Sequence, residues 1–289
     1  MNERIASPGK TIEILQSNQF QFLKKYGQNF LIDLHVLDKI LASAQIGPED
    51  VCVEIGPGIG GLTQALAERA DRVIAVEIDK RLIPILSANL DRYPNVHILN
   101  EDFLKLDLSA YLDAAGIRRP VKVIANLPYY ITTPIIMGLL EGSAPLHSIT
   151  VMVQEEVARR MQAGPGTKDY GALSLAVQYY SKPEIVAMVP PNCFIPRPNV
   201  GSAVIRLERA PAPPAAVRDE RLLFRIIRAS FGQRRKTMVN SLSNSQELSF
   251  SKEQVSAALR DLGFDERIRG EALTLVQFIE VSNRLAEGA

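Results

Sequence analysis

Short apolar runs alternate with amphipathic stretches along the middle of the chain. The apolar runs cover residues 51–55, 73–77, 96–99, 121–125 and 149–153. Between them, residues 62–69, 81–90 and 134–140 carry apolar side chains at helical spacing. Strands that alternate with helices are typical of a doubly wound, mostly parallel sheet. We therefore predict an α/β fold.

The flanking segments have different patterns. Residues 11–44 predict a helix, a loop over 24–31 and a second helix, while 185–189 and 202–207 predict two strands that close the sheet as a hairpin. The prolines of segment 209–217 indicate a linker, and residues 221–231, 252–262 and 273–285 predict helices only. We expect a domain over residues 1–212 with an N-terminal helical extension, and a small all-α domain over 213–289.

Composition narrows the protein class. The 289 residues are 46% hydrophobic, and 33 basic against 32 acidic side chains give a net charge of +1, so a nucleic-acid site must be a local patch. Two cysteines and three histidines are too few and too scattered for a structural zinc site, and no run approaches the roughly 18 apolar residues of a membrane span. We expect a cytoplasmic monomer without a metal ion and without membrane contact.

A glycine-rich turn joins the first strand of the sheet to a helix. Its glycines fit G-x-G-x-x-G at Gly56, Gly58 and Gly61. Glu77 ends the next strand, where a carboxylate accepts hydrogen bonds from ribose hydroxyls. This pattern does not separate NAD from S-adenosylmethionine, and a purely structural turn also stays open. Further carboxylates would repel a diphosphate and favour a cationic sulfonium; they are Glu54, Asp79 and Asp102.

The segment Asn126-Leu127-Pro128-Tyr129 follows the fourth strand at the same edge of the sheet. An exocyclic adenine amine is a poor nucleophile, because its lone pair is delocalised into the ring. Two acceptors that hold its hydrogens could weaken this conjugation: the side-chain oxygen of Asn126 and the carbonyl of Leu127. Pro128 fixes the turn, and Tyr129 offers a face on which a base can stack. The alternative is a strand-ending turn with packed tyrosines.

In this order, the motifs resemble the ribosomal RNA adenine dimethyltransferase family, in particular its bacterial small-subunit branch. The matching segments cover residues 26–31, 53–63, 76–79, 125–130, 194–200 and 231–236. The resemblance implies a Rossmann-like class I methyltransferase domain. It also implies transfer of methyl groups from S-adenosylmethionine to the N6 atoms of two adjacent adenosines near the 3′ end of small-subunit (16S) ribosomal RNA. The implied products are N6,N6-dimethyladenosine and S-adenosylhomocysteine. We expect the RNA to be methylated within a partly assembled subunit during ribosome biogenesis, and naked RNA stays open as the alternative.

The resemblance also implies roles for single residues. The residues implied to bind the cofactor are Asn29, Leu31, Gly56, Gly58, Glu77, Ile78, Asp102 and Asn126. In this reading Asn126 lies between methyl donor and target. Phe194 would form the second wall of an aromatic sandwich with Tyr129 around the adenine, although a core aromatic is an equally good interpretation.

Basic residues cluster after residue 217. Arg221, Arg225 and Arg228 share one face of a predicted helix, and Arg234, Arg235 and Lys236 follow it. We predict that these six, together with Lys24 and Lys25, contact RNA phosphates, although a solvated helix face is the alternative for the helix. We also expect residues 164–171 to form a flexible loop that orders when RNA binds.

Three other functions stay open. A large-subunit adenine methyltransferase of the macrolide-resistance type shares fold and chemistry, but residues 231–236 favour the small-subunit branch. A ribosome-assembly factor would bind immature small subunits with methylation secondary or absent. An NAD-dependent oxidoreductase is disfavoured by the segment 126–129 and by the acidic pocket.

Overall fold

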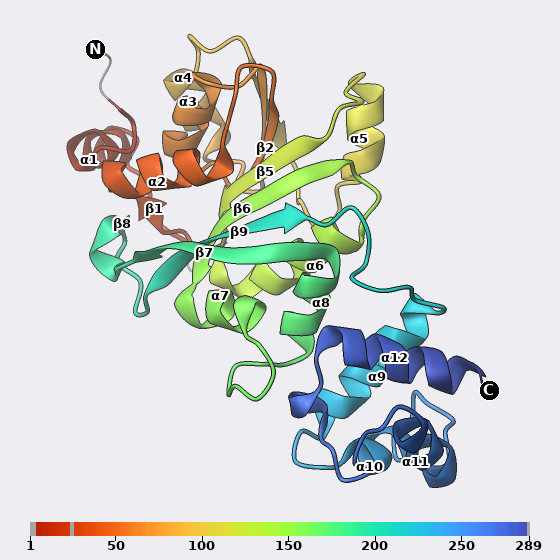
Figure 1. Ribbon diagram of the computed structural model, residues 1–289. Helices are drawn as coiled ribbons and strands as arrows, with labels where there is room; N and C mark the ends of the chain where they lie inside the picture. Colours follow the sequence, from red (N-terminus) through yellow and green to blue (C-terminus); the bar gives the residue numbers. More distant parts are fainter. Residues whose placement is uncertain (1–3, 24–25, 288–289) are drawn as a thin grey trace. The chain divides into compact units, whose positions relative to one another are not determined.

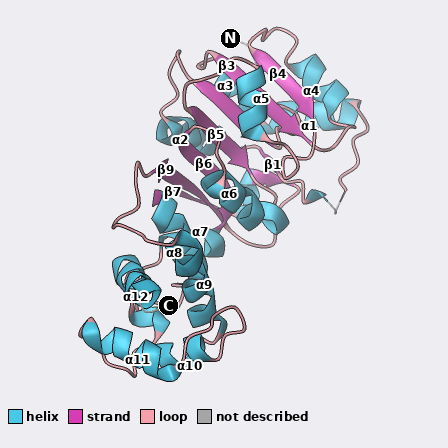
Figure 2. Cartoon of the chain, turned by 90° about the vertical axis from the view of Figure 1, so that its right-hand side faces the viewer, coloured by secondary structure: helices cyan, strands magenta, loops and turns pink. Residues whose placement is uncertain are grey.

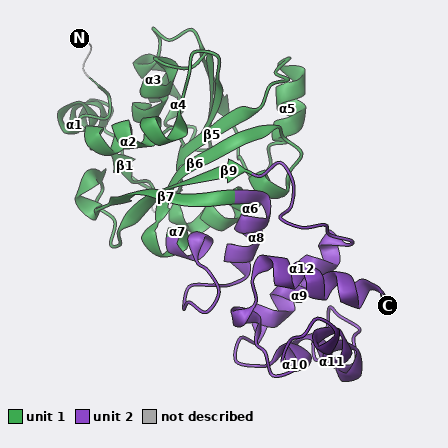
Figure 3. Cartoon of the chain, in the orientation of Figure 1, with its two compact units in different colours: residues 1–158, 182–209 green, residues 159–181, 210–289 purple. Residues whose placement is uncertain are grey.

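The chain divides into two compact units, which Figure 3 shows in different colours. The computed structural model describes residues 4–23 and 26–287. Unit 1 comprises residues 1–158 and 182–209, and unit 2 comprises 159–181 and 210–289. Segment 159–181 joins unit 2 because Tyr170, Leu175 and Tyr179 pack into the core of the C-terminal helices. The predicted division of the chain into domains at residue 212 stays a prediction.

A seven-stranded sheet with the order β4-β3-β2-β5-β6-β9-β7 forms the centre of unit 1 (Figure 1). The strands are β2 (Val51–Ile55), β3 (Arg72–Glu77), β4 (Val96–Asn100), β5 (Val121–Asn126), β6 (Leu146–Gln154), β7 (Ser181–Val189) and β9 (Ser202–Arg209). Strands β2 to β6 pair in parallel, and β9 is antiparallel to β6. The predicted α/β fold and the neighbouring positions of the last two strands are confirmed.

Helices cover both faces of this sheet (Figure 2). They are α1 (Pro8–Ser17), α2 (Leu34–Ala44), α3 (Gly61–Ala67), α4 (Ile83–Asn89), α5 (Leu108–Ala114), α6 (Thr132–Glu141) and α7 (Glu155–Gln162), with short 3-10 turns η2 (Tyr129–Ile131) and η3 (Pro191–Cys193). Every residue of β2 is buried, which is why this strand is apolar apart from Glu54 and does not alternate.

A second, two-stranded sheet escapes sequence analysis. Strand β1 (Phe30–Leu31) pairs antiparallel with β8 (Phe194–Ile195), so that Leu31 lies opposite Phe194. Two residues are too few to show an alternating pattern. The pairing joins the N-terminal loop to the segment before β9 and thereby fixes the position of Asn29.

Unit 2 is helical. Its helices are α8 (Ala172–Tyr180), α9 (Glu220–Gly232), α10 (Met238–Ser243), α11 (Lys252–Asp261) and α12 (Leu275–Glu287), with the 3-10 turn η4 (Gly270–Ala272). Asp219 begins α9 by accepting a hydrogen bond from the Leu222 amide, and a capping box of Ser251 and Gln254 begins α11.

The prediction that residues 164–171 order only with RNA is wrong, because contacts within unit 2 hold this loop. The Gly166 amide donates a hydrogen bond of 2.8 Å to the Glu271 carbonyl. Tyr170 is 1% exposed, and its hydroxyl donates to the Leu273 carbonyl at 2.8 Å. A buried tyrosine in the core does not appear as a local sequence signal, since its partners lie about a hundred residues further along the chain.

Candidate active site

A cavity opens at the carboxyl ends of β2, β3 and β5. It encloses about 810 Å³ of free space, a volume that includes its open mouth. Predicted residues that line it are Asn29, Gly56, Gly58, Glu77, Ile78, Asp102, Asn126, Leu127, Pro128 and Tyr129. Because parallel strands present their carboxyl ends at one edge, four separate motifs meet here.

The glycine turn leaves backbone exposed to the cavity. Gly56 has a φ of +69°, and a Cβ atom there would meet open space. Gly58 has a φ of +61°, and a Cβ atom would come within 2.6 Å of the Phe30 ring. The turn therefore needs glycine for its conformation at both positions, and at Gly58 also for the close approach of the N-terminal loop. The free space beside Gly56 is consistent with a bound cofactor.

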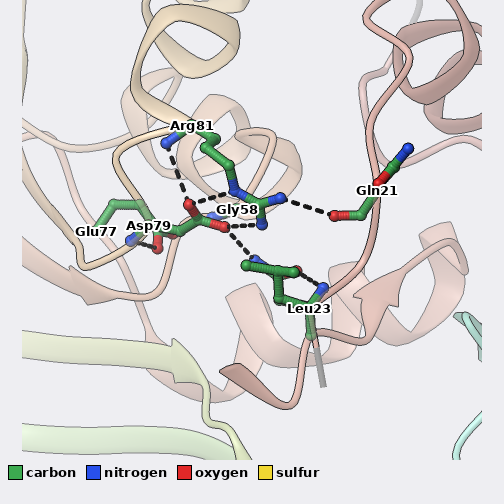
Figure 4. Close-up of polar contacts among 7 residues, drawn as sticks. Gln21, Leu23, Gly58, Glu77, Asp79 and Arg81 are labelled. Carbon is green, nitrogen blue, oxygen red and sulfur yellow. Dashed lines mark hydrogen bonds and ion pairs between the residues drawn. The ribbon is translucent and has the colours of Figure 1, made fainter. Parts of the chain in front are cut away.

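The Glu77 carboxylate lies at the end of β3 between two backbone amides (Figure 4). Its Oε2 accepts from the Gly58 amide at 3.1 Å, and its Oε1 accepts from the Asp79 amide at 2.8 Å. Burial raises the pKa of Glu77 to about 6, and these two hydrogen bonds limit the rise. The carboxylate is therefore held in one orientation and is ionised at neutral pH.

Asp79 connects the N-terminal loop to β3 (Figure 4). Its Oδ2 accepts from Gln28 Nε2 at 2.9 Å and from Arg81 at 2.6 Å, and Arg81 also donates to the Gln21 carbonyl at 3.1 Å. Burial alone would raise the pKa of Asp79. The hydrogen bonds from Arg81 nevertheless hold this pKa below its ordinary value. The sequence does not predict this role of Arg81, because a basic residue in the turn before a helix is not part of a recognisable motif.

Glu54 faces a smaller cavity, which is lined also by Phe30, Leu31, Gly56 and Asn126. Its side chain is 2% exposed, and no described residue hydrogen-bonds Oε2. Burial raises the pKa of Glu54 to about 8, so the group is mostly neutral at pH 7. The expectation that Glu54 and Asp79 add negative charge to the main cavity is therefore wrong: neither residue lines it, burial favours the neutral form of Glu54, and Asp79 is paired with Arg81.

The free energy of unfolding of Glu54→Gln should increase relative to that of the wild type as pH rises, because only the wild type loses stability through this group. The folded pKa of Glu54 lies above its ordinary 4.5, so the native state retains a proton that the unfolded chain releases. Stability from this group is present below pH 4.5 and is lost as pH rises toward about 8, at up to about 1.4 kcal/mol per pH unit. Glutamine does not titrate. Urea unfolding of both proteins between pH 5 and 8 measures the effect; a difference that is independent of pH, with an unchanged m-value, would contradict it.

The Asn126 side chain is oriented by the N-terminal loop. Its Nδ2 donates to the Asn29 carbonyl at 2.7 Å, so its Oδ1 remains the acceptor. Pro128 follows with a φ of −59°, and its carbonyl accepts from the Thr132 hydroxyl at 3.2 Å. The Tyr129 hydroxyl lies 2.7 Å from Ser202 Oγ of strand β9. Both polar side chains of this turn are thus fixed by partners distant in sequence.

Two predicted site residues lie outside the main cavity. Leu31 lines the smaller cavity. Phe194 does not line the main cavity; it is 3% exposed and belongs to the hydrophobic core cluster beneath α2 and α3. Its role in an aromatic sandwich stays a prediction. Gln28 and Tyr130 also line the main cavity, although the sequence predicts no individual role for either residue.

The predicted RNA-binding residues divide into two groups. Arg221, Arg228, Arg235 and Lys236 are exposed, whereas Arg225 and Arg234 are half-buried and hydrogen-bond carbonyls of unit 2. Lys24 and Lys25 lie outside the described residues. Within residues 4–23 and 26–287, no helix is long and apolar enough to cross a membrane, and no group of three or more His, Cys, Asp or Glu side chains could hold a metal ion.

Solved methyltransferases share this fold. The 23S rRNA methyltransferase ErmE is 27% identical, with a TM-score of 0.70 over 89% of this chain and 100% of that chain. A dimethyladenosine transferase from Plasmodium falciparum is 26% identical, with a TM-score of 0.73 over 87% and 95%. The sheet order and the cavity, with Glu77 beside the glycine turn, define a class I S-adenosylmethionine-dependent methyltransferase.

The sequence comparisons are more specific. Residues 19–287 match the family model for ribosomal RNA adenine dimethylases, and the chain belongs to this family. Curated relatives named ribosomal RNA small subunit methyltransferase A are 60% identical in Lachnoclostridium phytofermentans, over 98% of both chains, and 54% identical in Alkaliphilus oremlandii, over 99% of both. The family resemblance predicted from the motifs is confirmed.

Proposed function

We propose that this enzyme transfers methyl groups from S-adenosylmethionine to the N6 atoms of two adjacent adenosines near the 3′ end of small-subunit ribosomal RNA, within a partly assembled subunit. The relatives at 54% and 60% identity carry the small-subunit name, which supports this substrate over large-subunit RNA. The observation that carries the chemistry is the Asn126 amide, which lines the cavity and is held by the Asn29 carbonyl at 2.7 Å.

The residues that line the cavity suit the cofactor by their chemistry. Glu77 would accept hydrogen bonds from the ribose hydroxyls, Asp102 would bind the adenine amine, and Ile78, which is 44% exposed, would pack on the adenine ring. The methionine end would lie beside Gly56, with Asn29 and Leu31 contributed by the N-terminal loop. Bound S-adenosylmethionine supplies an electrophilic methyl group, and S-adenosylhomocysteine leaves as product.

Asn126 and Leu127 prepare the target amine. The Asn126 Oδ1 and the Leu127 carbonyl would accept its two hydrogens and draw the lone pair out of conjugation with the ring. The nitrogen would then form a bond to the methyl carbon as the sulfur–carbon bond breaks, and the surplus proton would leave to water. No side chain has to titrate, so catalysis depends on position.

Tyr129 would stack on an adenine that has left its base stack. We expect Tyr129→Ala to lower kcat/KM for RNA by about five- to a hundredfold, corresponding to roughly 1 to 3 kcal/mol of stacking. Tyr129→Phe retains the ring and loses only the contact with Ser202, and should stay close to wild type. Emission of 2-aminopurine at the target position should rise on binding to the wild type and less with Tyr129→Ala. Equal effects of Ala and Phe would exclude stacking.

Methyl transfer from labelled cofactor tests the whole proposal. Under-methylated small subunits, large subunits and protein-free ribosomal RNA are compared, and modified nucleosides are mapped. We expect dimethyladenosine in small subunits alone. Label in large-subunit RNA would indicate the resistance-type reaction, and tight small-subunit binding without label would indicate an assembly factor.

A further inference from the structure

The Arg234 guanidinium is fully engaged inside unit 2. Its Nη1 donates to the Lys168 carbonyl at 2.7 Å, its Nη2 donates to the Thr167 carbonyl at 2.9 Å, and its Nε donates to Glu271 Oε2 at 2.8 Å. Each guanidinium nitrogen thus has an acceptor within unit 2, and the Glu271 carboxylate balances the charge of Arg234. The planar fork of arginine suits such a bridge, whereas a lysine ammonium does not.

Glu271 completes the connection from the other side. Its carboxylate pairs with Arg234, while its backbone carbonyl accepts from the Gly166 amide at 2.8 Å. The 164–171 loop is therefore held at three consecutive residues, from Gly166 to Lys168. Tyr170 anchors the end of the loop by its edge-to-face contact with Phe231, whose ring lies 5.8 Å away between centroids.

Three other cations beside this bridge remain available. Lys168, Arg235 and Lys236 are exposed, and none of them forms an ion pair with a described residue. Arg235 and Lys236 directly follow Arg234, and the backbone of Lys168 contacts the Arg234 guanidinium. Asp169 follows Lys168 in the sequence, and the Glu271 carboxylate is paired with Arg234. The bridge thus brings a loop cation next to a pair of cations at the end of α9.

We propose that Arg234 is a positioning residue that holds Lys168 next to Arg235 and Lys236, and that these three side chains together bind RNA phosphates. Lys168 becomes a substrate-contacting residue, and Arg234 acts through it without touching RNA. The partner assignment rests on the proposed function, since it takes ribosomal RNA as the substrate. Oriented cations on one rigid surface bind a phosphate backbone without ordering a loop on binding.

The first experiment tests the bridge without RNA. Arg234→Lys keeps the charge and removes the fork, and Arg235→Lys is the matched control at an exposed neighbour. Hydrogen exchange of the Gly166 amide in the full chain should accelerate by about tenfold or more in Arg234→Lys, since hydrogen bonds to charged groups contribute roughly 1.5 to 3 kcal/mol. It should stay unchanged in Arg235→Lys. Unchanged exchange in both variants would overturn the bridge.

The second experiment measures binding to under-methylated small subunits between about 50 and 200 mM salt. Lys168→Ala and Arg235→Ala should each weaken binding and lower the slope of log K against log salt by about 0.7 to 0.9, the loss of one phosphate contact. Arg234→Lys should weaken binding as Lys168→Ala does, and the double variant Arg234→Lys/Lys168→Ala should bind no more weakly than Arg234→Lys alone.

The outcomes distinguish the role of Arg234, the shared phosphate-binding surface and the proposed function. Wild-type binding by Lys168→Ala would overturn the shared surface, and wild-type binding by Arg234→Lys with an additive loss in the double variant would make Arg234 a simple phosphate contact. Lys168 is exposed, so its variant tests the surface even if Arg234→Lys unfolds. Wild-type protein that fails to bind or methylate small subunits would instead contradict the proposed function, while the exchange result would still stand.

Discussion

Asn126→Ala is expected to lower turnover by about a hundredfold or more, the usual cost of removing one preorganised polar group from an active site, while cofactor affinity stays within a few-fold of wild type. The alanine removes the acceptor for the target amine. Single-turnover methyl transfer and calorimetric titration of S-adenosylmethionine separate the two effects.

A matched variant distinguishes orientation from polarity. Asn126→Asp keeps an acceptor but loses the Nδ2 group that donates to the Asn29 carbonyl at 2.7 Å. Two oxygens would then face each other, so the carboxylate should turn away and turnover should fall nearly as far as with alanine. A fully active Asn126→Ala would contradict the role of the amide, and an active Asn126→Asp would show that its hydrogen bond to the N-terminal loop is dispensable.

Glu77→Gln is expected to weaken S-adenosylmethionine binding by about ten- to a hundredfold, because hydrogen bonds to a charged group contribute roughly 1.5 to 3 kcal/mol. Both carboxylate oxygens already accept from backbone amides, of Gly58 and Asp79, so the glutamine amide group would oppose one of these donors. Calorimetry measures the loss. Glu101→Gln, an exposed position on the same cavity, removes the same charge and is the control.

The pH dependence of cofactor binding provides a second test of Glu77. Burial raises its pKa to about 6, so the free enzyme loses the carboxylate form as pH falls through 6. Wild-type affinity should therefore decrease between pH 7 and 5, while Glu77→Gln should be insensitive in this range. Equal pH dependence of both proteins would assign the titration to another group.

Much of the fold follows from local patterns. The five parallel strands were predicted because each is a short, mainly apolar run in alternation with helical segments. The positions of Gly56, Glu77 and Asn126 follow from the rule that functional side chains gather at the carboxyl ends of parallel strands. The two-stranded pairing of β1 with β8 gave no such pattern, since its strands have two residues each and pair across more than 160 positions.

The charge states of the site residues could not be predicted from the sequence. Glu54 and Asp79 carry the same charge in sequence, yet burial neutralises the first and Arg81 pairs with the second. Similarly, Arg234 belongs to a basic triplet with Arg235, and only its contacts with residues 37 and 66 positions away distinguish the two. Burial and partner choice depend on the folded environment, so composition could not reveal them.

The sequence by itself determined the α/β architecture, the family and the motifs that meet at the cavity, because these depend on hydrophobic periodicity and on residue types within short segments. The tertiary structure decided which groups are ionised, how the Asn126 amide is turned and which arginines are available. These properties depend on contacts such as Gln28 with Asp79 and Asn126 with Asn29, 51 and 97 residues apart, which exist only after the chain has folded.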